Sequence, residues 1–373
     1  MGNTAEDFVS HFRVIRDPRI ERNKLHPLES ILFVAMCAVL SGIESWEGME
    51  EFGEAREEWL KRYVELPYGI PSADTFGRVF AQIAPQEFEK GFLSWVRGVY
   101  KKTEGEVIAI DGKTLRGSRR GGSFGQGPLH LVSAWASSNR LFLGQVETDE
   151  KSNEIEAVPR LLEILDLKGC IVTLDAMGCQ TDIVAKIREK KADYVLALKG
   201  NQGTLHEDVK QYWGDSKLPK EEYDEFTTVE KGHGRLETRI YRITDQIGWL
   251  GPREDWKGLQ SIAMVDSQRE IGEQKTLERR YYLTSLKPDS KAFAKAIRAH
   301  WEIENKVHWC LDVTFREDRS TVWIKQAARN LSLLRRLALN MLRKDASNKK
   351  SLNMRRYRAA LNPKYLELVL AIN

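Results

Sequence analysis

Three acidic residues, Asp111, Asp175 and Glu304, are the strongest candidates for chemistry in this 373-residue chain. Asp111 follows the apolar, mostly β-branched segment 107–110, and Asp175 follows a similar segment, 170–174. Such segments are typical of buried strands. We therefore expect each strand to end at its aspartate and the two carboxylates to lie side by side.

Glu304 is expected on a long helix from Ser290 to about Leu311. At about 100° per residue, Glu304 falls on the same side as Phe293 and Ile297, on the apolar stripe that faces the core. Glu302 falls on the solvent side and needs no special explanation. A carboxylate on a buried face needs a partner or a metal, so Glu304 is predicted to be the third acid.

Three carboxylates from separate elements could hold two divalent metal ions roughly 4 Å apart, as in two-metal phosphodiester chemistry. Carboxylate oxygens favour Mg²⁺ or Mn²⁺, which are hard cations. The alternative is three ordinary acids at strand ends and on a helix. His300 and His308 flank Glu304 at four residues on either side. We expect them to orient a carboxylate or to contact phosphate.

Several other sites are not supported. Gly112 to Thr114 resembles the end of a phosphate-binding loop, but the glycine which that motif requires five residues earlier is Val107. A G-x-S-x-G nucleophile elbow is absent from the sequence. Four scattered cysteines without a C-x-x-C pair argue against a zinc knuckle and predict reduced thiols in a cytosolic protein.

The elements that must position the acids form a mixed α/β arrangement. Three strands of antiparallel type are followed by alternating helices and strands. The first helical region could form a helix-turn-helix-like DNA reader, although a plain helical packing domain fits equally well. We divide the chain into an N-terminal helical domain (1–104), a first part of the catalytic core (105–218), a β-rich insertion (219–288), a second part of the core (289–345) and a basic C-terminal tail (346–373).

Basic residues suggest where a polyanion would bind, although the net charge is only +4. Between residues 325 and 364 there are twelve Lys or Arg and one acid. A phosphate-binding surface is favoured there over a merely solvated face. The glycine-flanked turn 231–235 is either a simple hairpin loop or a contact to a DNA backbone. The predicted DNA contacts are Lys113, Arg116, Arg119 and Arg120, in the basic segment that follows Asp111, and Arg335 and Arg336.

A membrane protein or a secreted protein is not expected. The longest apolar run, 31–40, is far shorter than the roughly 20 residues that a membrane-spanning helix needs. The first residues are polar and acidic, unlike a signal peptide. The chain is therefore predicted to act in the cytoplasm.

The sequence resembles the ISAs1-type transposases of bacterial insertion sequences, also called H-repeat-associated proteins, within the IS4-like DDE group. The order of the motifs is kept over nearly the whole chain. The segments that carry the resemblance are Ala109–Lys113, Val172–Ala176 with Gln180, Leu198–Gln202, His300–Asn305 and Leu311–Phe315.

This resemblance implies an RNase H-like core interrupted by a β-strand insertion before the helix that carries the glutamate. It implies that Asp111, Asp175 and Glu304 form the catalytic and metal-binding DDE triad. The expected activity is metal-dependent cleavage at the ends of the element, followed by strand transfer into target DNA. His300 and Leu311 stand where the group often has an arginine and a lysine, so the basic contacts must come from other residues.

Further expectations come with the resemblance. Lys199, Asn201 and Gln202 are predicted DNA contacts, and the partners are the terminal repeats and target DNA at the bacterial nucleoid. A homodimer would bring two ends together. Two alternatives stay open: a catalytically silent DNA-binding relic, and an RNase H-like nuclease that cuts DNA without strand transfer.

Overall fold

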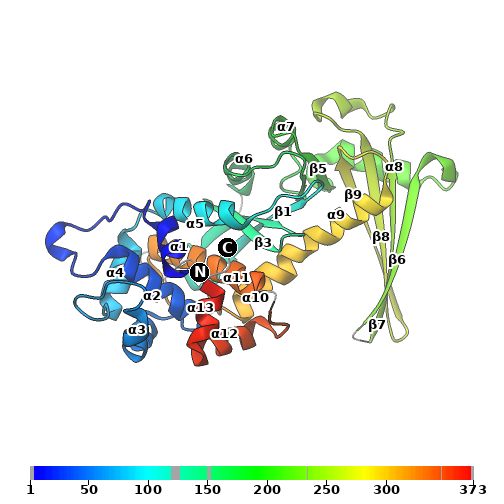
Figure 1. Cartoon of the computed structure of the whole chain (residues 1–373). Coiled ribbons are helices and arrows are strands. Elements are labelled where there is room, and N and C mark those ends of the chain that lie inside the picture. Colours follow the sequence, from blue (N-terminus) through cyan, green and yellow to red (C-terminus); the bar gives the residue numbers. More distant parts are fainter. Residues whose placement is uncertain (1–3, 119–126, 149–152, 233, 346, 371–373) are drawn as a thin grey trace.

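The computed structural model describes residues 4–118, 127–148, 153–232, 234–345 and 347–370. A group of helices lies at one end, a mixed sheet lies in the middle, and long paired strands project at the other end (Figure 1). Within the described residues, nine strands form one sheet in the order β3-β2-β1-β4-β5-β9-β8-β7-β6. Asp111 lies in the central part of this sheet, Asp175 directly follows one of its strands, and Glu304 lies just beyond the long helix beside it.

Apolar segments of the sequence form the first five strands, whereas β6 and the first half of β9 are mostly exposed. The strands are β1 (Val107–Leu115), β2 (Leu129–Ala136), β3 (Leu141–Thr148), β4 (Ile171–Leu174), β5 (Asp193–Leu198), β6 (Asp224–Gly232), β7 (Arg235–Thr244), β8 (Ser261–Ile271) and β9 (Gln274–Thr284).

The helices occupy the N-terminal region, the connections of the sheet and the C-terminal third. They are α1 (Thr4–Phe12), α2 (Leu28–Leu40), α3 (Trp46–Leu60), α4 (Ala73–Gln82), α5 (Pro85–Val99), α6 (Glu154–Ile164), α7 (Thr181–Glu189), α8 (Gly203–Gly214), α9 (Ser290–Glu302), α10 (Trp309–Val313), α11 (Lys325–Lys344), α12 (Leu352–Leu361) and α13 (Pro363–Leu370).

The first five strands confirm the predicted mixed sheet. β1, β2 and β3 pair as an antiparallel meander. β4 joins β1 in parallel, and β5 joins β4 in parallel. Helix α6 precedes β4, and helix α7 joins β4 to β5, because parallel neighbours need a crossover connection. This is the RNase H-like core that was expected, with the helical region before it.

The strands of the predicted β-rich insertion, 219–288, continue the core sheet. β9 pairs antiparallel with the free edge of β5, from Val195 opposite Thr284 to Leu198 opposite Tyr281. β8, β7 and β6 then follow as successive antiparallel neighbours. The insertion therefore extends the core sheet, because an unpaired edge of β5 would leave backbone groups without partners. The distant ends of these strands project away from the core (Figure 1).

Helix α11 joins the N-terminal helices to the sheet. Most of its residues are buried, and it packs on α2, α4, α5 and β3. Asn330 donates to the carbonyl oxygens of Phe80 and Ile83 at the end of α4. Asn340 exchanges two hydrogen bonds of 2.8 Å with the backbone of Phe142 in β3. Buried amides with satisfied partners fix the orientation of such a helix.

The C-terminal segment, predicted as a basic tail, contains the helices α12 and α13. Helices α12 and α13 pack on each other and on α11, and α12 also contacts α2. Arg356 of α12 is buried and donates to the carbonyl oxygen of Val39 and to Glu44. This segment thus contributes a buried cation to the helical region.

Helix α9 lies against the sheet opposite β1, β4, β5, β6 and β7. Asp289 caps it by accepting from the backbone N–H groups of Lys291 and Ala292. Phe293 and Ile297 pack with Tyr241 and Tyr282 of the extended part of the sheet. Within the described residues, no helix has the length and apolar character of a membrane span.

Candidate active site

Asp111 and Asp175 are brought together by the pairing of β1 with β4. Val107, Ile108 and Ala109 lie opposite Ile171, Val172 and Thr173 in parallel register. Asp111 comes two residues after Ala109, and Asp175 comes two residues after Thr173. The sequence predicts that β1 ends at Asp111. The strand instead continues to Leu115, because β2 still pairs with it there. Asp111 therefore lies where β1 loses its neighbour β4.

Glu304 lies on a π-helical turn, Ile303–His308, between α9 and α10. Ile303 and Val307 are the buried residues of this turn, whereas Glu304 is exposed. The expectation that Glu304 lies on the buried face is therefore wrong, because a wider turn changes the angle between successive side chains. Single π turns of this kind occur frequently at functional sites.

The three acids line one pocket of about 240 Å³. Burial and the negative charges of Asp175, Glu304 and Glu154 raise the pKa of Asp111 to about 7. Burial and Glu154 also raise the pKa of Asp175, against the effect of the backbone N–H groups of Gly178 and Met177. The pocket therefore concentrates negative charge in a partly desolvated place.

The donor set of this pocket suits a hard divalent cation. Carboxylate oxygens that raise one another's pKa gain stability when a cation neutralises them. Within the described ranges, no group of three or more His, Cys, Asp or Glu side chains converges closely enough to ligate a metal ion. The three acids thus share a pocket without forming a ligand cluster in this conformation.

The two predicted histidines lie beside the acids. The His308 Nδ1 atom is 3.4 Å from Oδ2 of Asp111, and the His300 Nδ1 atom is 3.0 Å from Oγ1 of Thr173. Burial lowers the pKa of His300 to about 4 and that of His308 to about 3. Both rings are therefore neutral near pH 7 and carry no positive charge that would attract a phosphate.

The basic residues that follow Asp111 have different environments. Lys113 is buried, with its Nζ atom 2.5 Å from Asp312 and 3.7 Å from Asp318. Arg116 keeps 83% of its side chain exposed. Arg119 and Arg120 lie outside the described residues. In this group, Arg116 is therefore the described residue that could reach a DNA backbone.

Lys199, Asn201 and Gln202 lie next to Asp175. Lys199 lines the pocket and is exposed. The side-chain amide of Asn201 donates to the Ala176 carbonyl at 2.8 Å, and that of Gln202 donates to the Cys179 carbonyl at 2.6 Å. Two of these residues thus brace the loop after Asp175, and the third presents a cation to the pocket.

Arg335 and Arg336 do not form a phosphate-binding surface. Both are buried, at 2% and 0% exposure. Arg335 is paired with Glu44 at 2.6 Å, and Arg336 is paired with Glu317 at 2.7 Å. The prediction that they contact DNA is corrected, because α11 lies in the interior and its cations neutralise buried acids.

Sequence reasoning did not identify Glu154, which lies behind the aspartates. Its Oε1 atom is 2.5 Å from Nε2 of His130, and Nδ1 of His130 is 2.8 Å from Oγ1 of Thr114. Its charge acts on both Asp111 and Asp175. A buried acid at the start of a helix was the available signal, but the sequence does not show that α6 begins next to β1.

Replacing Gly112 with alanine is expected to destabilise the protein by about 1–3 kcal/mol. The added Cβ would lie 2.3 Å from the Glu154 carboxylate and 2.9 Å from the His130 ring. Gly214 at the end of α8 is the matched control, since a Cβ there meets nothing within 4 Å. The free energy of unfolding from urea titration measures both. An unchanged midpoint for Gly112→Ala would contradict this packing.

Comparisons with known proteins identify related families. Residues 9–96 match a DDE_Tnp_1-associated family, and residues 102–341 match the transposase DDE domain. The protein YncI of Escherichia coli O157:H7 is 44% identical over 372 residues, covering 99% of this chain and 95% of YncI. The H repeat-associated protein YhhI of Escherichia coli K12 is 41% identical, covering 97% of each chain.

Among solved structures, the piggyBac transposase synaptic complex with hairpin DNA matches with a TM-score of 0.46 and 11% identity. The match covers 98% of this chain and 79% of that chain.

Proposed function

The chain belongs to the DDE transposase family with its associated N-terminal region, and we propose that it is the active transposase of an ISAs1-type bacterial insertion sequence. It would cleave DNA at the ends of the element and join the freed 3′ ends to target DNA. The observation that carries this proposal is one pocket lined by Asp111, Asp175 and Glu304, which come from three distant segments of the family-matched region.

Asp111, Asp175 and Glu304 would hold Mg²⁺ or Mn²⁺, and such ions lower the pKa of an attacking water or 3′-hydroxyl and stabilise the leaving oxygen. The protein's own groups prepare the pocket. The backbone N–H groups of Met177 and Gly178 hold the carboxylate of Asp175. His308 lies beside Asp111 as a neutral ring.

The proposed reaction has two steps, and in each step one oxygen–phosphorus bond forms while another breaks. In cleavage, a water oxygen bonds to the phosphorus and the 3′-oxygen of the adjoining nucleotide leaves. In strand transfer, that 3′-oxygen bonds to a target phosphorus and a target oxygen leaves. Arg116 and Lys199, both exposed, would contact the approaching backbone. The partners would be terminal repeats and target DNA at the bacterial nucleoid, with a homodimer to pair two ends.

The test uses the full-length protein, Mg²⁺ and a duplex that carries the terminal repeats from the DNA flanking the gene. Cleaved ends and joined products are expected with the unaltered protein, and neither is expected with Asp175→Ala or with EDTA. If the unaltered protein does not cleave, the remaining interpretation is a catalytically silent DNA-binding relic. Cleavage without joined products would indicate a nuclease. Full activity of Asp175→Ala would show that the triad is wrongly assigned.

A further inference from the structure

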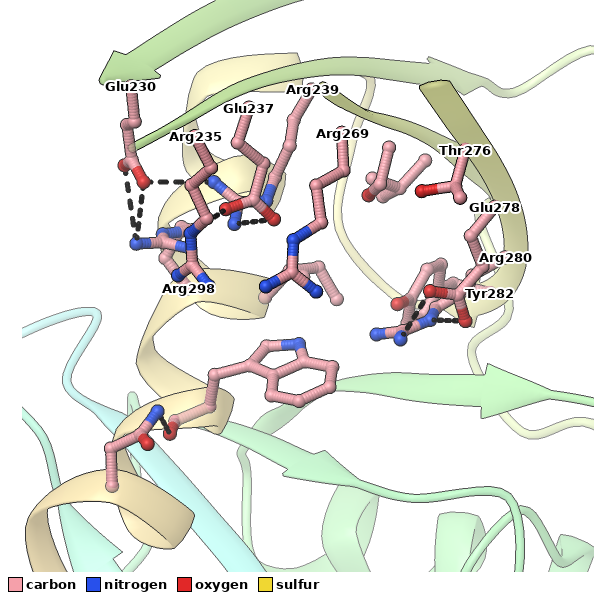
Figure 2. A pocket seen from close by; sticks show the side chains of 15 residues that line it. Glu230, Arg235, Glu237, Arg239, Arg269, Thr276, Glu278, Arg280, Tyr282 and Arg298 are labelled. Atoms are coloured by element: carbon pink, nitrogen blue, oxygen red, sulfur yellow. Dashed lines mark hydrogen bonds and ion pairs between the residues drawn. The ribbon is translucent and has the colours of Figure 1, made fainter. Parts of the chain in front are cut away.

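A second hollow, of about 430 Å³, lies between the projecting strands and α9 (Figure 2). Side chains from β6, β7, β8 and β9 line one side of it, and side chains from α9 line the other. We call it the arginine hollow because five arginines line it: Arg235, Arg239, Arg269, Arg280 and Arg298. Its volume is within the range of pockets that hold small ligands, so more than one phosphate could fit.

The arginine hollow has an excess of positive charge. Three glutamates, Glu230, Glu237 and Glu278, accompany the five arginines. Arg239 is paired with Glu237 at 2.5 Å and with Glu230 at 3.0 Å. The other pairs are Arg298 with Glu230 at 3.2 Å, Arg280 with Glu278 at 2.7 Å and Arg235 with Glu237 at 3.9 Å. Two positive charges are left without a compensating acid.

Arg269 is the arginine whose charge is least compensated. It lies on β8 opposite Glu237 of β7 and Thr276 of β9. Its guanidinium projects into the middle of the hollow (Figure 2). No ion pair or hydrogen bond to its side chain occurs within the part of the chain that the structure describes. An unpaired guanidinium among other cations is suited to bind an anion bidentately.

The arginine hollow continues into the pocket lined by Asp111, Asp175 and Glu304, which we call the carboxylate pocket. Five residues line both cavities: Glu278, Arg280, Tyr282, Ile297 and Trp301. The Arg280 guanidinium lies over the Trp301 ring, 4.6 Å from its centroid, at the point where the two cavities meet. A polyanion that occupied the hollow would therefore reach the three acids without leaving the protein surface.

We propose that the arginine hollow binds backbone phosphates of the DNA strand that leads away from the reacting phosphate. This inference rests on the proposed function, since it takes DNA as the substrate. Arg269 makes the central phosphate contact, with Arg298 beside it, and Glu237 limits affinity by neutralising its neighbours. The site would bind phosphate in a sequence-independent way, as guanidinium contacts to a DNA backbone do.

The test measures DNA binding by the full-length protein in EDTA, with a fluorescein-labelled duplex that carries one terminal repeat. Arg269→Gln is expected to weaken binding about fivefold and to lower the slope of log affinity against log salt by about one. Arg269→Gln combined with Arg298→Gln should weaken it further. Glu237→Gln should tighten binding, because it removes the acid that neutralises Arg235 and Arg239.

Arg253→Gln is the matched control. Arg253 is an exposed arginine of the same insertion, in the loop before β8, and it does not line the hollow. Its substitution should change the affinity less than twofold and leave the salt slope nearly unchanged. A far-ultraviolet circular dichroism spectrum of each variant separates lost binding from lost folding, and Glu237→Gln predicts a gain that misfolding cannot imitate.

The outcomes separate this inference from the proposed function. If the unaltered protein binds and cleaves DNA but neither Arg269→Gln nor Glu237→Gln changes the affinity or the salt slope, the inference is wrong and the function stands. If the unaltered protein does not bind DNA, both the inference and the proposed function are wrong. If inorganic phosphate at constant ionic strength stabilises the unaltered protein but not Arg269→Gln, while DNA affinity is equal in both, the hollow is a small-anion site and the DNA assignment is wrong.

Discussion

Replacing Glu304 with glutamine is expected to lower the rate of DNA cleavage by about a thousandfold, whereas replacing Glu302 with glutamine should leave it within about threefold. Glutamine keeps the size of the side chain and removes its charge. Glu304 lines the carboxylate pocket together with Asp111 and Asp175. Glu302 does not line it and is instead ion-paired with Lys306 one turn away.

The comparison of the two variants is informative because the residues are two positions apart on one continuous helical segment. A general loss of helix stability would affect both variants, but a loss of metal binding would affect one. The measurement is the initial cleavage rate of the terminal-repeat duplex at several Mg²⁺ concentrations. Equal losses in the two variants, or an unimpaired Glu304→Gln protein, would show that Glu304 has no special role.

Replacing Glu317 with glutamine is expected to lower the free energy of unfolding by about 3–5 kcal/mol, because it leaves the buried cation of Arg336 without its counter-ion. Glu317 and Arg336 are 1% and 0% exposed, and their atoms are 2.7 Å apart. The guanidinium also lies 5.2 Å from the centre of the Phe142 ring. This pair connects α11 to the segment that follows α10.

The effect should depend on pH in a defined direction. Burial alone would raise the pKa of Glu317, but the neighbouring cations, Arg336 first, hold it below its usual value. The pair therefore stabilises the folded state above the pKa of the unfolded chain, and this contribution is lost as the pH falls through the folded-state pKa. The difference in the free energy of unfolding between the unaltered protein and Glu317→Gln should thus shrink below about pH 4.

Urea titrations monitored by circular dichroism measure these free energies. Combining Glu317→Gln with Arg336→Met should recover part of the loss, because no buried charge is then left alone. The control is Lys210→Gln, which removes a pair with Glu207 at 3.1 Å in which both side chains are more than half exposed. It should change the free energy by less than about 0.5 kcal/mol. A similarly small change for Glu317→Gln would contradict the structural role of the pair.

The pairing of the aspartates could be predicted because it depends on local pattern. A short apolar segment that ends in an acid predicts a buried strand, and parallel neighbours place equivalent positions side by side. The helix of Glu304 was predicted in the same way. Its exposure was not, because a π turn depends on how α9, α10 and the sheet pack together, and periodicity assumes a regular helix.

The basic residues show the opposite case. A run of cations around Arg335 and Arg336 has the composition of a phosphate-binding surface, yet both side chains are buried against Glu44 and Glu317. Those acids are distant in sequence, so composition cannot reveal the pairing. Arg280, by contrast, shares one strand face with Glu278 and Tyr282, and a period of two was a signal that could have been used.

By itself, the sequence determined the α/β class, the strands that carry Asp111 and Asp175 and the helix that carries Glu304, because hydrophobic periodicity and strand ends are local properties. Only the tertiary structure decided which charges are buried, that β9 extends the core sheet along β5, and that the arginine hollow opens beside the acids. These features depend on pairings between residues far apart in the chain, and the free energy of such pairings arises only when the segments meet.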